Sequence, residues 1–294
     1  MADLNDDGRD DVISGSYWPG DLYVFFGEGN GKFAAGEMLK DPRGKNASAG
    51  EPWNNPEAPD HDSLATAPRV VDWDCDGDLD LVVGNVLGHV VLLLNEGGPK
   101  APKFVRKGPI RAGGDVLKVD DADAGPAIGD WDRDGLWDLI VGGGAGSVVF
   151  FRNVGRIGAP RFGTGVEIVE GGRGKTGGEP QDPGVRCKPQ VADWNGDGAL
   201  DLLVGDLAPT AGPRRELTPE QRVSKRHLEG ERAGLMATIE RLKRKCDDDL
   251  ARLGADDRKL HDAARKRCGE VATELEPLTP RKGSGFVWVY LRKP

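Results

Sequence analysis

The stretch DWDCDGDLDLVVG, at residues 72–84, joins a loop of aspartates to a run of strand-forming residues that ends in glycine. Its loop pattern, D-x-[DN]-x-D-G-x-x-D, occurs four times: DLNDDGRDD from Asp3 (loop 1), DWDCDGDLD from Asp72 (loop 2), DWDRDGLWD from Asp130 (loop 3) and DWNGDGALD from Asp193 (loop 4). The copies continue into VISG, LVVG, LIVG and LLVG, each of which predicts a β-strand.

The loops carry the oxygen ligands that a hard cation prefers, from side chains at positions 1, 3, 5 and 9 and a backbone carbonyl at position 7. The predicted ligands are Asp3, Asn5, Asp7, Arg9, Asp11, Asp72, Asp74, Asp76, Asp78, Asp80, Asp130, Asp132, Asp134, Leu136, Asp138, Asp193, Asn195, Asp197, Ala199 and Asp201. Glycine at position 6 permits a tight turn. No loop contains histidine, and Cys75 lies at position 4, between ligand positions, so the set favours Ca²⁺ over Zn²⁺ or Mg²⁺ and predicts about four ions.

The loops differ from those of an EF-hand. An EF-hand needs a glutamate at position 12 and a following helix, whereas position 12 here lies in a predicted strand as Ser14, Val83, Val141 or Val204. Four turns without any metal are the remaining alternative. That alternative would leave four clusters of carboxylates repelling one another without compensation.

The loops mark a longer repeat. Their spacings are 69, 58 and 63 residues, and a strand such as PRVVDW at 68–73 leads into each of the last three. A third strand follows (DLYVFFG, HVVLLLN, SVVFFRN), then a turn with a phenylalanine at Phe33, Phe104 or Phe162. Four antiparallel strands in roughly 60 residues, repeated, are typical of the blades of a β-propeller.

The repeat unit resembles the FG-GAP/VCBS family of calcium-binding propeller repeats, over residues 1–207 and 285–294; integrin α-subunit heads carry related blades. The resemblance implies an all-β propeller with a calcium site in each blade, usually in exported or cell-surface proteins. Propellers of these families commonly have seven blades, and this chain has four loops. A small closed ring, an open arc and part of a larger ring all remain open.

Residues 208–284 predict a helical hairpin that is inserted into the fourth blade. Residues 285–294 then predict the closing strand of that blade. TPEQ forms a capping box with Thr218 at the N-cap, and apolar residues then recur at helical spacing. Gly254 is the expected stop, and Asp256 the expected cap of a second helix that ends at Glu276-Pro277. A disulfide between Cys246 and Cys268 is conceivable but is not favoured by this register.

Two further features each have two interpretations. Trp73, Trp131 and Trp194 share loop position 2, where they would pack between blades or stack on a sugar. The irregular segment 41–67, with Trp53, Asp60, His61 and Asp62, is either a polar surface excursion or a binding loop.

The charge and hydropathy of the chain limit its partners. The net charge of the 294 residues is −9, and four bound Ca²⁺ ions would change it to −1. The sequence has no cluster of basic residues that would predict nucleic-acid binding. No apolar stretch is long enough to span a membrane. The first loop begins at Asp3 with no strand before it, so we expect a fragment or shortened gene whose export signal lay upstream, and an extracellular, periplasmic or cell-surface location.

The sequence predicts a calcium-stabilised binding or scaffold module with a protein or carbohydrate ligand of unknown identity. The alternative is the propeller part of an exported carbohydrate-active enzyme, a lyase or hydrolase. Nucleophile-elbow, zinc-helix and P-loop motifs do not occur, which favours a non-enzymatic role without establishing it. Unpaired strand edges at the first and fourth blades predict either mutual pairing or edge-mediated self-association.

Overall fold

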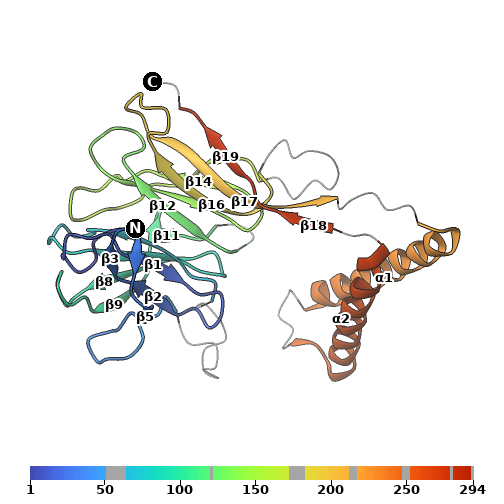
Figure 1. Cartoon of the computed structure of the whole chain (residues 1–294). Helices are drawn as coiled ribbons and strands as arrows, with labels where there is room; N and C mark the ends of the chain where they lie inside the picture. The colour runs from blue at the N-terminus through green and yellow to red at the C-terminus, as the bar shows by residue number, and fades with distance from the viewer. Residues whose placement is uncertain are drawn as a thin grey trace. The chain divides into compact units, whose positions relative to one another are not determined.

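The computed structural model describes residues 1–50, 64–119, 122–171, 183–211, 217–246, 252–278 and 281–292. The chain divides into two compact units (Figure 1). The first contains Met1–Lys175, Glu179–Ala208 and Ser284–Pro294; the second contains Thr176–Gly178 and Pro209–Gly283. In the described parts of the chain, no helix is both long and apolar enough to cross a bilayer.

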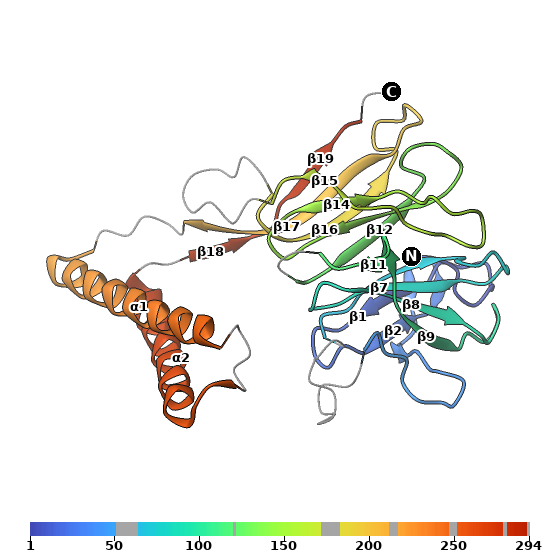
Figure 2. The same cartoon turned by 180° about the vertical axis from the view of Figure 1, so that it is seen from behind.

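The first unit contains three antiparallel sheets and most of a fourth, in chain order (Figures 1 and 2); the end of β17 and most of β18 belong to the second unit. Sheet 1 contains β1 (Val12–Gly15), β2 (Leu22–Phe25) and β5 (Glu37–Met38); sheet 2 contains β6 (Ala67–Val71), β7 (Asp80–Gly84), β8 (Val90–Asn95) and β9 (Phe104–Pro109). Sheet 3 contains β12 (Gly125–Gly129), β13 (Asp138–Gly142), β14 (Val148–Phe151) and β15 (Val166–Val169); sheet 4 contains β16 (Val185–Ala192), β17 (Asp201–Ala211), β18 (Arg281–Ser284) and β19 (Val287–Tyr290).

Two short hairpins accompany the sheets: β3 (Gly27–Gly29) with β4 (Lys32–Phe33), and β10 (Arg111–Ala112) with β11 (Asp115–Val116). The expectation of a mainly β protein with two helices is therefore confirmed.

Consecutive sheets pack against each other and share three hydrophobic cores. Leu22 and Val24 of sheet 1 pack with Leu81 and Val83 of sheet 2, and equivalent clusters join sheet 2 to sheet 3 and sheet 3 to sheet 4. The strands that begin the four sheets lie next to one another, since β6 contacts both β1 and β12, and β12 contacts β16. Burial of these alternating apolar residues is the main stabilising term for the unit.

The glycine that ends each second strand has a packing reason. A Cβ built on Gly84 would lie 2.2 Å from the carbonyl oxygen of Ala124, and one on Gly142 would lie 2.2 Å from that of Cys187. Both carbonyls belong to the chain entering the next sheet, so only glycine permits the two backbones to come this close. The repeated glycine is therefore a contact between neighbouring sheets.

The second unit contains α1 (Pro219–Lys245) and α2 (Ala255–Leu275), followed by a 3₁₀ turn, η2 (Glu276–Leu278). Thr218 caps α1 in a capping box with Gln221, as predicted. The prediction for α2 is wrong in detail: Gly254 is the N-cap, without a side-chain cap, and Asp256 lies in the first turn. Cys246 and Cys268 are both free thiols.

Candidate metal centre

The four loops share one backbone conformation. Position 4 has a positive φ in every copy, 54° at Asp6, 61° at Cys75, 65° at Arg133 and 77° at Gly196, and the glycine at position 6 is also left-handed. A left-handed conformation is costly for residues other than glycine, so loops 1, 2 and 3, with Asp6, Cys75 and Arg133 at position 4, need compensating contacts.

The position 1 aspartate supplies such contacts from inside the loop. In loop 3 the two carboxylate oxygens of Asp130 accept the N–H groups of Asp134 and Gly135, both at 3.0 Å. The position 5 carboxylate adds another, since Asp134 Oδ1 accepts the N–H of Leu136 at 2.9 Å. These hydrogen bonds fix the orientation of the two carboxylates relative to the loop backbone.

The position 9 aspartate has a role that sequence reasoning missed. Asp80 is buried at the start of β7; one of its oxygens accepts the N–H of Trp73 at 2.8 Å, and the other accepts the N–H of Asn95, after β8, at 2.7 Å. The other three repeats make the same pair of bonds: Asp11 with Leu4 and Gly27, Asp138 with Trp131 and Asn153, and Asp201 with Trp194 and Arg292. Position 9 thus joins the loop to the end of the third strand in every sheet. Each oxygen keeps a further lone pair for a cation.

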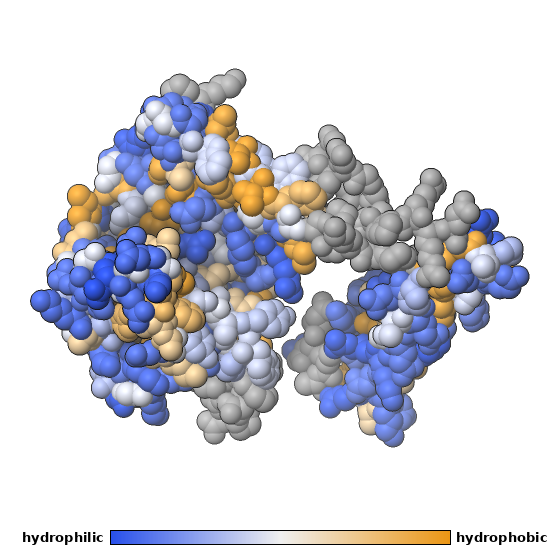
Figure 3. Space-filling view, in the orientation of Figure 1, coloured by the Kyte–Doolittle hydropathy of each residue, from blue (hydrophilic) through white to orange (hydrophobic). Residues whose placement is uncertain are grey.

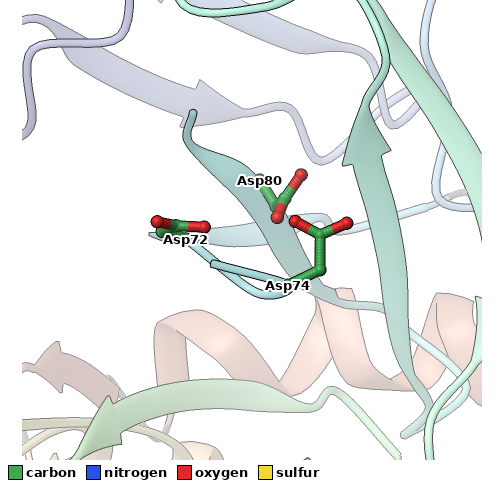
Figure 4. Close-up of side chains that lie close together, drawn as sticks. All are labelled: Asp72, Asp74 and Asp80. Carbon is green, nitrogen blue, oxygen red and sulfur yellow. The ribbon is translucent and has the colours of Figure 1, made fainter. Parts of the chain in front are cut away.

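Loops 2 and 3 gather their carboxylates most closely among the described residues. One oxygen each from Asp72, Asp74 and Asp80 lies within 4.8 Å of the others, and Figure 4 shows these three carboxyl groups beside one another at the base of β7. Asp130, Asp132 and Asp138 form the equivalent group in loop 3. Position 3 is asparagine in loops 1 and 4 (Asn5 and Asn195), so those loops bring together fewer charges.

The donor set of loop 2 fits a hard cation. Asp72 Oδ1 and Asp78 Oδ1 are buried and accept no hydrogen bond. Burial, together with repulsion from Asp76 and other carboxylates of the loop, raises the pKa of Asp78 to about 6. Burial also raises the pKa of Asp80 to about 6. A bound divalent cation would neutralise the repulsion between these carboxylates and would provide a partner for their unpaired oxygens.

The Asp78 side chain was not among the expected side-chain ligands, because position 7 was assigned a carbonyl role. Position 7 is Arg9, Leu136 or Ala199 in the other loops, and its structural role throughout is to donate its N–H to the position 5 carboxylate. Loop 2 is the one loop with an acid at position 7, so Asp78 adds a further carboxylate to this loop.

Loop 3 differs because an arginine lies over its acids. Arg152, just after β14, contacts Asp132 Oδ2 at 2.5 Å and Asp134 Oδ2 at 3.0 Å. The N–H of Leu136 and the Arg152 guanidinium hold the pKa of Asp134 below its usual range. In loop 1, Arg9 contacts Asp7 at 2.7 Å in a similar way. A cation entering loop 3 must therefore compete with Arg152.

We expect Arg152→Gln to strengthen calcium binding at loop 3, because it removes the competing positive charge from two predicted ligands, Asp132 and Asp134. The expected gain in affinity is roughly two- to fivefold, since exposed ion pairs are individually weak. Calorimetric titration of Ca²⁺ measures it, and Arg156→Gln, in the next turn, is the control that should leave the affinity unchanged. Equal or weaker binding in Arg152→Gln would show that Arg152 does not compete.

The tryptophans of loop position 2 do not share one environment. Trp73 packs against Trp137 and Phe162 of sheet 3, with ring centroids 4.9 and 6.1 Å apart, and the Arg292 guanidinium lies 5.0 Å from the Trp131 ring. Trp194 is 62% exposed, so the interpretation that these tryptophans pack between blades does not hold for Trp194. The candidates Trp53, Asp60, His61 and Asp62 lie outside the described residues.

Comparison with known proteins supports the repeat. Residues 3–83 match the model of the FG-GAP-like repeat, which contains loops 1 and 2, so the recognition of FG-GAP-type repeats is confirmed there. No curated protein matches the chain. Among solved structures, the chain is similar to an Agrocybe aegerita lectin described as recognising non-reducing terminal N-acetylglucosamine, at 18% identity and a TM-score of 0.36. The match covers 75% of this chain and 52% of the lectin, so the chain spans about half of that protein's length.

Proposed function

We propose, from the FG-GAP-like repeat at residues 3–83, that the four sheets are blades of a propeller arc and that the chain is an extracellular, calcium-stabilised binding or scaffold module. The loop and strand unit recurs from Asp130 and Asp193, beyond the matched residues, with the same hydrogen bonds at position 9. FG-GAP repeats are typical of extracellular proteins, which supports the proposed location.

Loop 2 carries the calcium proposal. It brings together one carboxylate oxygen each from Asp72, Asp74 and Asp80, and a buried oxygen of Asp72 has no other partner. All the ligands are oxygens, the donor type that Ca²⁺ takes in sets of six to eight. Loop 3 is the second proposed site, with Arg152 as competitor, and loops 1 and 4 are weaker sites because asparagine replaces a carboxylate.

In this function the ion would stabilise the turn between the first and second strands of a blade. Carboxylates that repel one another in the free loop would become ligands, and the loop would resist local opening. A rigid arc would then present its connecting loops to a partner, as loops on a stable scaffold often do.

Titration of the whole chain with Ca²⁺ tests the proposal. We expect Asp74→Asn to remove about one equivalent of bound calcium, because Asp74 is an exposed ligand whose loss leaves the fold intact. Asp115→Asn, which removes the same charge from the exposed hairpin strand β11, should bind like the wild type. A wild-type chain that binds no Ca²⁺ at millimolar concentration, or an Asp74→Asn variant with full stoichiometry, would contradict the assignment.

A further inference from the structure

The three internal sheet interfaces follow one rule. The face of each sheet that meets the next one carries a residue of the second strand and its register partner on the third: Ile13 with Val24, Val82 with Leu92, and Ile140 with Phe150. We call this the trailing face, and the opposite face, which receives the previous sheet, the leading face. In sheet 4 the same register pairs Leu203 with Val289 on the trailing face.

The trailing face of sheet 4 is apolar but uncovered. The residue that begins the apolar run of the third strand is 1% exposed at Leu22, 0% at Val90 and 0% at Val148, but 70% at the equivalent Val287. The residue at loop position 2 shows the same difference in exposure between sheets. Leu4 of loop 1 is 1% exposed, whereas Trp194 of loop 4 is 62% exposed. Val289 is 40% exposed, and Figure 3 shows apolar surface in the region of β19.

Sheet 4 also keeps the glycine used for close packing. Gly84 and Gly142 each admit a backbone carbonyl of the following sheet, whereas a Cβ on Gly205 would meet only Lys188 O of its own sheet, at 3.7 Å. Val287 pairs with Gly205, as Val90 pairs with Gly84. Sheet 4 therefore has the apolar side chains and the close-packing glycine of an interface, and no described residue of another sheet packs against them.

The complementary leading face is uncovered on sheet 1. Phe104 and Phe162, after the third strands of sheets 2 and 3, are 1% and 6% exposed because the preceding sheet covers them. Phe33, which occupies this place in sheet 1, is 40% exposed. In the interface between sheets 2 and 3, the residues equivalent to Trp194 and Phe33 are in contact. The ring centroids of Trp73 and Phe162 lie 6.1 Å apart.

We propose that the trailing face of sheet 4 binds the leading face of sheet 1 of a second copy of this chain. The contact continues the three interfaces already present, with Trp194 of one copy against Phe33 of the other and a backbone carbonyl entering the gap at Gly205. Each copy carries both faces, so association is head to tail, and it closes or extends according to the rotation between copies. The apolar area on both faces supplies the driving force.

Sedimentation velocity of the whole chain over a wide concentration range tests this proposal. We expect the wild type to self-associate, and Val287→Lys and Phe33→Glu each to weaken association at least tenfold. Val223→Lys, on α1, is the matched control, because Val223 is 62% exposed and lies outside both faces. An equimolar mixture of Val287→Lys and Phe33→Glu should regain a one-to-one complex, since one copy retains the leading face and the other retains the trailing face.

Circular dichroism and chemical denaturation confirm that the variants fold, which is expected because both substituted side chains are exposed. A wild type that is monomeric at about 100 μM overturns the proposal. So does association that survives Val287→Lys, which would indicate pairing of strand edges, or a mixture that stays monomeric, which would indicate a contact of like faces.

Discussion

Asp11→Ala should lower the free energy of unfolding by roughly 2–6 kcal/mol, the largest effect expected from a single substitution here. Asp11 is fully buried, and its two oxygens accept the N–H groups of Leu4 and Gly27 at 2.9 and 2.8 Å. Alanine leaves two buried donors without a partner, and each unsatisfied donor costs about 1–3 kcal/mol. Urea denaturation with a chelator present measures this loss without any contribution from calcium.

The neighbouring residue provides the control. Asp10 is exposed, and Asp10→Ala removes the same charge from the same loop, so its effect should stay within about 0.5 kcal/mol. If the two variants lost similar stability, charge rather than hydrogen bonding would be the cause. If neither lost stability, the link between loop and third strand would be unimportant.

Removal of calcium should lower the melting temperature by about 5–11 °C for each occupied site. Binding to the folded state alone at one hundred times the dissociation constant stabilises it by about 2.7 kcal/mol. For a unit of about 200 residues, each kcal/mol of stability changes the melting temperature by about 2–4 °C. Differential scanning calorimetry with and without a chelator gives the shift.

Magnesium is the control ion for this experiment. It prefers octahedral geometry and retains its waters, so it should restore the melting temperature poorly at equal concentration. A melting temperature indifferent to both chelator and added Ca²⁺ would contradict the metal proposal. Asp74→Asn should lack the part of the shift that belongs to loop 2.

The features that could be predicted from the sequence are the ones encoded locally and repeatedly. The aspartates, glycine and following strand of each loop lie within about a dozen residues, and four copies make the pattern plain. Thr218 and Gln221 form a capping box through contacts three residues apart. The prediction that Asp256 caps α2 was wrong because an acidic residue near the start of a helix is favourable both at the N-cap and in the first turn.

The features that could not be predicted depend on distant partners. Asp80 meets the N–H of Asn95, fifteen residues away, and a carboxylate looks the same in sequence whether it accepts from backbone or binds metal. Arg152 lies eighteen residues after Asp134. The exposure of Trp194 depends on which sheet follows its own, and no property of the residue itself distinguishes it from Trp73.

The helical insertion has a consequence for the order of folding. Sheet 4 closes when Asp206 accepts the N–H of Phe286, eighty residues later in the chain. α1 and α2 pack through local contacts, so the hairpin can form early and bring the two ends of the insertion together. Shortening the effective loop from about eighty residues to a handful saves about 2 kcal/mol of closure entropy, at about 0.6 kcal/mol per halving. The insertion would then act as a folding aid for the last sheet, because the pairing of β19 with β17 would depend on helices that lie outside that sheet.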